Sequence, residues 1–95
     1  VSPRGEIIID SGAVNAIKNG KSLLPAGVKE VRGFFEKGDH VIIKNQHNTE
    51  CARGLSSFSS KEVEKIKGSH SREIKNILGY SSREEIIHKD DLVKI

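Results

Sequence analysis

Apolar residues along the first part of the chain predict a central strand followed by a short helix. Residues 6–10 are an aliphatic run between acidic ends, a pattern typical of a strand covered on both faces. Asp10 or Ser11 can then cap a helix, which Asn19 and Gly20 end. The apolar side of this helix carries Ala13, Ala16 and Ile17.

The clearest strand signal is a pair of segments that predicts a β-hairpin. Residues 40–44 and 49–55 flank the polar stretch 45–48, a connection length common in hairpins. Upstream of this hairpin, the valines of 28–31 are expected to face the core. One ring of the aromatic pair at 34–35 is expected to be buried with them.

The second half of the chain predicts two short helices and a closing strand region. Ser59 and Glu62 have the spacing of a capping box, and the helix that they start ends at Gly68. A further helix is predicted over 71–79, with Ser71 as its cap. Residues 86–88 and 92–95 are predicted as two closing strands, or as one strand with a bend between them.

These elements predict a single mixed α+β domain over residues 1–95, mainly β in content. The helices are too short to serve as crossovers in a parallel sheet. A small barrel-like sheet with two or three short helices at its ends fits the pattern better. Closure of such a sheet removes exposed strand edges.

The composition restricts the class of protein but does not identify its partner. The formal net charge of +3 and a pI near 9.1 suit a nucleic-acid partner and equally an ordinary mixed surface. A single cysteine, Cys51, excludes an internal disulfide framework and favours a reducing, cytoplasmic compartment. No apolar run approaches membrane-spanning length, so no membrane partner is expected. The absence of methionine, even at the first position, indicates a part of a longer protein.

Residues 20–28 are predicted to form a shaped recognition loop. Glycines near both ends permit unusual backbone conformations, Pro25 fixes one torsion, and Lys21 and Ser22 offer donors to an anionic partner. A phosphate-binding P-loop is the alternative for Gly-Lys-Ser, but it needs a glycine at the position of Asn15, and it needs a strand before it and a helix after it. Recognition therefore fits this stretch better than nucleotide binding.

Six short stretches occur together in an order and spacing that point to one domain family. They are DSGAV at 10–14, GKSLLPAGV at 20–28, GD at 38–39, ARGL at 52–55, ILGY at 77–80 and IHKD at 87–90. This set resembles the C-terminal domain of glutamate 5-kinases, which has the PUA fold, a small pseudo-barrel. An RNA-targeting PUA domain of an RNA-modifying enzyme such as a pseudouridine synthase is the alternative. The stretches SLLP at 22–25 and IHKD at 87–90 favour the C-terminal domain of glutamate 5-kinases.

The resemblance implies a parent enzyme that uses ATP and magnesium to phosphorylate the side-chain carboxylate of glutamate in proline biosynthesis. The ATP, glutamate and proline sites of such a parent lie in an amino-acid-kinase domain that precedes this one. The present chain is then a noncatalytic domain without a cofactor of its own. Its expected partners are the kinase domain, structured RNA and further subunits of a homo-oligomer.

The resemblance also implies an RNA-binding face, which relatives of this fold build from the first helix, the glycine loop and a strand near the C-terminus. Basic side chains and backbone amides can meet phosphates there. By position, the face contains Lys18, Gly20, Lys21, Ser22, Leu23, Leu24, Gly27, Lys29, Arg32, His88 and Lys89. A purely structural role for 23–25, as a plug of the barrel end, remains open.

Four departures from the family stand at Ser11, Ser57, Lys89 and Asp91, where alanine, asparagine, arginine and asparagine are usual. Lysine is a point donor and aspartate repels phosphate, so the last two weaken a bidentate contact by the closing segment. Three functional classes stay open: an RNA-binding module, a regulatory domain of the kinase, and a targeting domain of an RNA-modifying enzyme.

No catalytic or metal-binding constellation is predicted. His47 and Cys51 are four residues apart across a hairpin turn, but a zinc site needs about four ligands. His70 and Ser71 are adjacent, so their side chains point apart, and a cap explains Ser71 better than a nucleophile does. The acidic pair at 90–91 is typical of a solvated corner.

Overall fold

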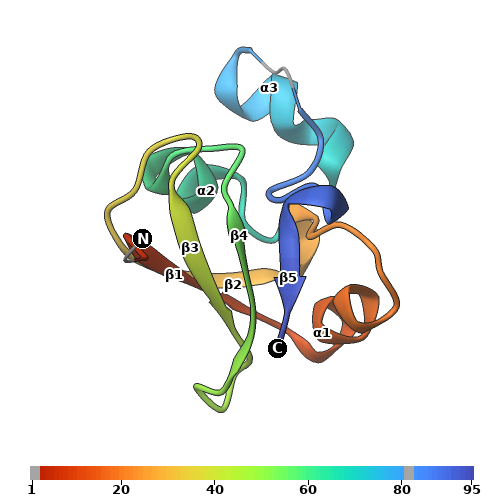
Figure 1. Cartoon of the computed structure of the whole chain (residues 1–95). Helices are drawn as coiled ribbons and strands as arrows, with labels where there is room; N and C mark the ends of the chain where they lie inside the picture. Colours follow the sequence, from red (N-terminus) through yellow and green to blue (C-terminus); the bar gives the residue numbers. More distant parts are fainter. Residues whose placement is uncertain (1–2, 81–82) are drawn as a thin grey trace.

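A mixed five-stranded sheet forms the centre of the computed structural model, which describes residues 3–80 and 83–95. Its strands are β1 (Gly5–Ile9), β2 (Val28–Gly33), β3 (His40–Lys44), β4 (Glu50–Leu55) and β5 (Leu92–Lys94). They lie in the order β2-β1-β3-β4-β5, with β1 antiparallel to β2 and parallel to β3 (Figure 1). β1 has a partner on both sides, which confirms the predicted central strand.

The segments that lead into the two edge strands are bridged, which gives the fold its pseudo-barrel character. Leu23, shortly before β2, donates its backbone N–H to the carbonyl of Ile87, shortly before β5, over 3.0 Å. Ile86 donates in return to the carbonyl of Leu23 over 2.8 Å. Residues 20–27 and 86–89 are therefore neighbours, although most of the chain separates them.

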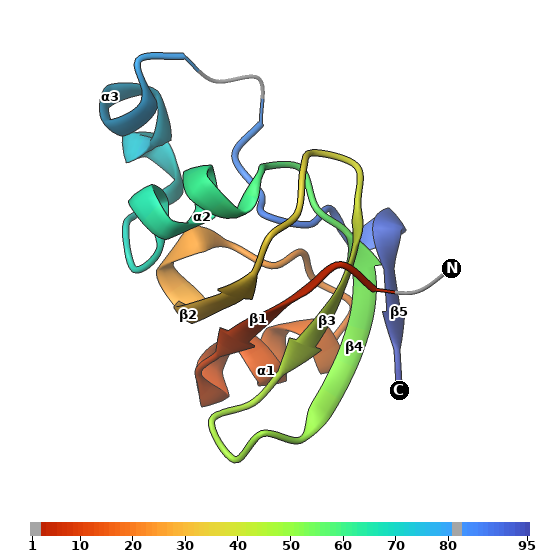
Figure 2. The same cartoon turned by 90° about the vertical axis from the view of Figure 1, so that its left-hand side faces the viewer.

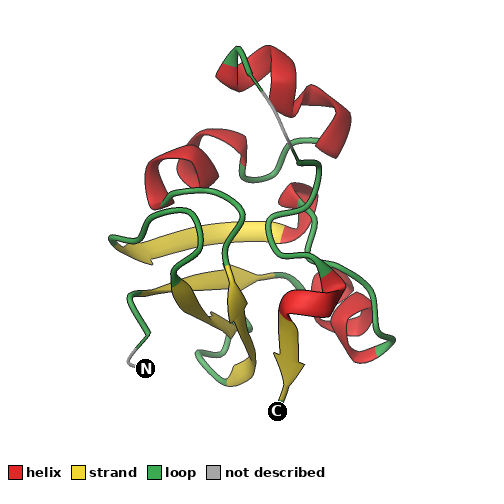
Figure 3. Ribbon diagram, turned by 45° about the horizontal axis from the view of Figure 1, so that its top comes forward, coloured by secondary structure: helices red, strands yellow, loops and turns green. Residues whose placement is uncertain are grey.

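Short helices surround the sheet (Figure 3). They are α1 (Ser11–Lys18), α2 (Ser60–Ile66) and α3 (Ile74–Leu78), with 3₁₀ turns η1 (Pro25–Gly27), η2 (Ser71–Glu73) and η3 (Lys89–Asp91). Figures 1 and 2 show α2 and α3 together beyond one end of the sheet, while α1 lies at the other. The predicted mixed, mainly β class is confirmed.

The predicted helix starts are confirmed for α1 and α2. The Asp10 side chain accepts from the backbone N–H of Ala13 over 2.8 Å and caps α1. Ser59 and Glu62 form the predicted capping box at the start of α2. Such side chains satisfy amides that have no partner within the first turn of a helix.

One apolar core, mainly aliphatic with two phenylalanines, joins every layer of the fold. It consists of Ile7, Ile9, Ile17, Leu23, Val28, Phe35, Val41, Ile43, Ala52, Phe58, Val63, Ile66, Ile74, Ile86 and Ile87. Of the aromatic pair, Phe35 is buried and Phe34 is 89% exposed, so one ring enters the core as predicted. β3 and β4 form the predicted hairpin, with Cys51 half-buried at a bulge between Glu50 and Ala52.

Two sequence predictions are corrected by the structure. Residues 86–88 form a single bridge to Leu23 and not a strand. Pairing cannot extend along the loop because Pro25 has no N–H to donate and the chain enters η3 after His88. The cap of the predicted helix over 71–79 is also wrong: the side chain of His70, and not that of Ser71, accepts from the N–H of Arg72.

Candidate nucleic-acid interface

The chain turns sharply at the end of α1 and presents Lys21 to solvent. Gly20 adopts φ +79°, a left-handed conformation that favours glycine. This turn lets the N–H of Lys21 bond to the carbonyl of Ala16 over 2.9 Å, so the loop folds back onto the helix that it leaves. Lys18 is also exposed, in the last turn of α1. Two ammonium groups therefore stand close together in sequence where helix and loop meet.

The glycine loop, residues 20–27, is held tightly against α1. A Cβ atom added to Gly27 would lie 2.5 Å from the Cβ of Ala13, which is closer than real side chains approach. The carbonyl of Gly27 accepts from the N–H of Asp10 over 2.9 Å. Within the loop, the side chains of Leu23 and Pro25 point inward and are buried, whereas the side chain of Leu24 is 46% exposed. The loop is therefore a fixed surface whose largest outward apolar side chain is that of Leu24, with the smaller Ala26 also exposed.

The segment before β5 is fastened to the same loop. The backbone N–H of Lys89 donates to Oγ of Ser22 over 2.8 Å, and this bond joins positions 67 residues apart. Nδ1 of His88 accepts from the N–H of Asp90 over 3.1 Å and caps η3. Further along the chain, in β5, Nζ of Lys94 donates to the backbone carbonyl of Lys18 over 3.4 Å. The closing segment therefore lies along both the loop and the end of α1.

Most residues of the predicted RNA face come together in this way. We define the helix–loop face as Lys18, Gly20, Lys21, Ser22, Leu24, Gly27, His88 and Lys89. Leu23 belongs to the core beneath it, as the structural alternative predicted, and is 1% exposed. Lys29 is exposed as the extra residue of a bulge in β2, where Glu30 and Val28 pair with successive residues of β1.

Arg32, also predicted for this face, lies on the outer surface of the sheet. Its Nε donates to Glu30 over 2.7 Å, and one terminal nitrogen donates to Oδ1 of Asn48 over 3.0 Å. The hydrogen bond from Arg32, reinforced by its charge, lowers the pKa of the exposed Glu30 carboxyl. Glu6 lies 3.7 Å from the same guanidinium. Arg32 is therefore engaged with carboxylates.

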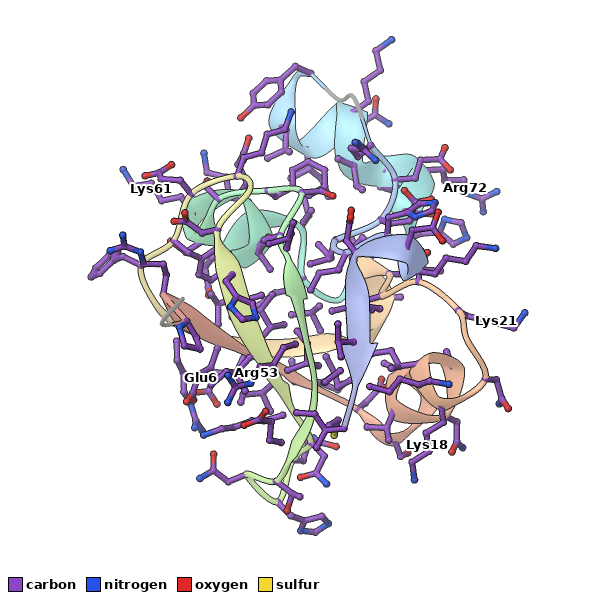
Figure 4. All side chains as sticks on the ribbon, in the orientation of Figure 1. Glu6, Lys18, Lys21, Arg53, Lys61 and Arg72 are labelled. Atoms are coloured by element: carbon purple, nitrogen blue, oxygen red, sulfur yellow. The ribbon has the colours of Figure 1, made fainter. Side chains whose placement is uncertain are left out.

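The outer sheet surface is a self-paired charge network. Lys44 bonds to Glu6 over 2.8 Å, and Arg53 bonds to Glu50 over 2.7 Å. Figure 4 shows Lys18 and Lys21 projecting on one side of the molecule, with Glu6 and Arg53 away from them over the strands. The lysines of the helix–loop face differ from this network: within residues 3–80 and 83–95, Lys18, Lys21 and Lys89 form no ion pair.

A shallow hollow of about 270 Å³ lies between the start of α1 and the glycine loop. Its lining includes Ser22, Leu24 and Gly27 of the predicted face. Gly12, Ala13 and Ala26 line it as well, and the sequence analysis did not assign them to the site. The signal that could have found them is their small size, because close packing of loop on helix needs small side chains on both.

The described residues contain no group of three or more His, Cys, Asp or Glu side chains that could hold a metal ion. His47 lies in the β3–β4 turn, and Cys51 stands at the bulge in β4. No helix in the described part of the chain has the length and apolar character needed to cross a membrane.

Comparison with known proteins identifies the fold family. The family model described as "PUA domain" matches residues 5–78. The chain belongs to the PUA domain family. Solved structures agree: a PUA domain from Aeropyrum pernix K1 in a tartrate complex has a TM-score of 0.64 at 20% identity, over 97% of this chain and 42% of that one. A chain of an archaeal box H/ACA sRNP complex has a TM-score of 0.66 at 23% identity, over 96% and 24%.

Glutamate 5-kinases are among the curated relatives of this PUA domain. The enzyme of Pelagibacter ubique is 61% identical over 95 residues, which are 100% of this chain and 26% of the relative. The enzyme of Brucella ovis is 50% identical over 93 residues, 98% of this chain and 25% of the relative. The chain thus spans about a quarter of these proteins and is homologous to their C-terminal domain. The predicted resemblance to the C-terminal domain of glutamate 5-kinases is confirmed. The alternative, a PUA domain of an RNA-modifying enzyme, is not favoured.

Proposed function

We propose that this PUA domain is a noncatalytic accessory domain of a glutamate 5-kinase and that it binds structured RNA through the helix–loop face. The Ser22–Lys89 hydrogen bond is the observation that carries the proposal. It holds a segment near the C-terminus against the glycine loop, so that lysines from three elements share one rigid surface. A surface prepared in this way loses little conformational freedom when a ligand binds.

The chemistry of the helix–loop face suits a phosphate backbone. Lys18, Lys21 and Lys89 supply positive charge without carboxylate partners in the described residues. Polar groups and exposed backbone beside them can fix the register of a folded RNA, whose recognition depends on shape and phosphate contacts. Asp90 and Asp91 are exposed next to Lys89 and offset part of its charge. Lys18 and Lys21 are therefore expected to supply most of the electrostatic attraction.

The parent protein supplies the rest of the proposed function. The identity of this chain to part of the glutamate 5-kinases supports a parent that phosphorylates glutamate with ATP and magnesium in proline biosynthesis. An amino-acid-kinase domain that precedes this chain holds those ligands and is its covalent partner. The parent works in the cytoplasm as a homo-oligomer, in which this domain shapes or regulates kinase activity.

The experiment is an NMR titration of the chain with a folded tRNA at low salt, repeated at higher salt and with duplex DNA. We expect salt-sensitive shifts that include residues 18–27 and 86–89, larger for tRNA than for DNA. Lys21→Glu should abolish most of these shifts. Lys61→Glu is the matched control, because Lys61 is an exposed lysine on the other side of the molecule (Figure 4).

Absence of shifts at low salt would overturn RNA binding by this domain. The regulatory role would then be tested in the full-length kinase, by comparing Lys21→Glu and Lys61→Glu for ATP-dependent glutamate phosphorylation. Equal shifts with tRNA and DNA would instead show an unspecific electrostatic surface and would contradict recognition of RNA structure.

A further inference from the structure

Two 3₁₀ turns with the same capping chemistry flank the glycine loop. In η3, Nδ1 of His88 accepts the N–H of Asp90 over 3.1 Å. In η2, Nδ1 of His70 accepts the N–H of Arg72 over 3.2 Å. A neutral imidazole that accepts through Nδ1 carries its proton on Nε2. Each turn therefore retains an N–H donor on its histidine.

η2 is anchored to the glycine loop as η3 is, but by a different contact. The N–H of Gly68, just before η2, donates to the carbonyl of Pro25 over 2.7 Å. Ile74, just after η2, is buried in the core. Contacts on both sides of η2 therefore fix its position relative to the loop.

The side chain of Arg72 is directed outward on the side of the molecule that carries the predicted RNA contacts. Figure 4 shows Arg72, Lys21 and Lys18 all projecting on the same side. In the described part of the chain, the Arg72 guanidinium has neither an ion pair nor a side-chain hydrogen bond, in contrast to Arg32 and Arg53 of the outer sheet surface. An exposed guanidinium without a carboxylate partner is suited to bind a phosphate with two parallel hydrogen bonds.

We propose that the RNA interface extends beyond the helix–loop face onto η2. In this extension, Arg72 binds a backbone phosphate, and Nε2–H of His70 donates to a neighbouring phosphate or sugar oxygen. The inference rests on the proposed RNA binding and adds a second contact region on the far side of the loop from η3. A folded RNA would then be held at α1, at the loop and at η2, which favours a broad, structured ligand over a short single strand.

The test measures affinity for a folded tRNA by fluorescence anisotropy over a range of salt concentrations. Arg72→Glu should weaken binding by about tenfold at low salt and lower the slope of log K against log salt by about 0.7–0.9. Lys61→Glu should change affinity less than twofold. Arg72→Lys should fall between wild type and Arg72→Glu, because the charge remains and the two-bond geometry is lost.

His70→Asn separates the two roles of the histidine. Asparagine is a good cap, so η2 should persist, while the Nε2–H donor is lost. We expect about threefold weaker binding by His70→Asn with an unchanged amide spectrum outside η2. An affinity equal to that of wild type would remove His70 from the interface.

The design distinguishes failure of this inference from failure of the proposed function. If Lys21→Glu weakens binding while Arg72→Glu behaves like Lys61→Glu, the interface ends at the helix–loop face and the extension is overturned. If wild type does not bind tRNA at low salt, both proposals fail. Because the Arg72 side chain is exposed, circular dichroism of Arg72→Glu should match wild type.

Discussion

At the scale of single residues, Leu23 and Leu24 show how tertiary contacts separate chemically identical neighbours. Leu23 is 1% exposed and Leu24 is 46% exposed. The backbone bonds between Leu23 and residues 86–87 turn its side chain into the core, and the next side chain along the extended chain then points outward. Periodicity marks both positions as apolar but does not say which one is buried.

Leu23→Ala is expected to destabilise the domain by about 2–5 kcal/mol, since it leaves a cavity where the two segments are bridged. Leu24→Ala should cost less than about 1 kcal/mol because its side chain is already half in water. Urea unfolding followed by circular dichroism compares the two free energies of unfolding. An equal loss of the free energy of unfolding in the two variants would contradict the finding that Leu23 is buried and Leu24 is half exposed.

Titration of the half-buried Glu62 carboxyl is expected to affect the stability of the fold. Burial alone would raise its pKa, but hydrogen bonds from the Tyr80 hydroxyl and from Ser59 outweigh burial and lower the pKa. A lowered pKa in the folded state adds stability above the ordinary glutamate pKa, and this contribution is lost as the pH falls through the folded value.

Glu62→Gln is expected to flatten this acid dependence. Glutamine can still accept from the N–H of Ser59 in the capping box, but it has no charge to lose. The free energy of unfolding, measured between pH 7 and pH 3 for both proteins, checks the prediction. Parallel curves for wild type and variant would show that other carboxylates cause the acid loss.

At the scale of elements, α1 depends on its surroundings. A helix of 8 residues is too short to persist by itself in water. Here Asp10 caps its first turn, Ile17 is buried in the core, and Gly27 packs against Ala13. The sequence correctly predicted this helix because its cap and apolar spacing are local signals, whereas its contact with the loop is not.

Asp10→Ala should weaken α1 without unfolding the domain. Loss of the cap leaves the N–H of Ala13 without its partner, at a cost of about 0.5–2 kcal/mol. Hydrogen exchange at Ala13 and Val14 should become faster than in wild type, while Asp10→Asn should remain close to wild type. Unchanged exchange in Asp10→Ala would show that the loop alone holds the helix.

The β3–β4 hairpin and the closing segment mark the limits of local prediction. The hairpin was found from alternation and turn chemistry, which act over a few residues. Of the two closing strands that the sequence predicts, the one over 92–95 is confirmed as β5, whereas residues 86–88 make one bridge and η3 follows. Its partner is a loop residue more than 60 positions earlier, and Pro25 limits the pairing, so no local pattern could show the outcome.

At the scale of the whole molecule, a single core is expected to give a single unfolding transition. Ile74 of α3 and Ile66 of α2 belong to the same core cluster as the strands, although α3 lies at the end of the fold. Tyr80 is the only tyrosine and the chain has no tryptophan, so its fluorescence reports on the region of α3.

Urea unfolding followed by Tyr80 fluorescence and by far-UV circular dichroism should give the same midpoint, as a two-state transition requires. A lower midpoint for fluorescence would show that α3 opens before the sheet. Leu23→Ala should shift both midpoints equally, because Leu23 packs in the core that connects the loop, the strands and the α2–α3 region.

Charge distribution also becomes interpretable only for the whole molecule. A net charge of +3 does not say where basic groups lie. The fold pairs Arg32, Lys44 and Arg53 with carboxylates on the sheet. Lys18 and Lys21 project on another side (Figure 4) and form no ion pair with any residue that the structure describes. The resemblance to the family predicts Arg32 on the RNA face. In the structure, the pairing of β1 with β2 places Arg32 directly opposite Glu6 on the sheet.

The sequence by itself determined the family, the class of fold and the starts of α1 and α2, because motifs, apolar periodicity and capping residues act locally. Only the tertiary structure decided which of the basic residues predicted for one face share a surface. Ser22 and Lys89, and likewise Pro25 and Gly68, meet through backbone bonds between distant segments. Such contacts depend on how the whole core packs, so they placed η3 and η2 beside the loop. The pairing of β2 with β1 placed Arg32 beside Glu6 on the sheet instead.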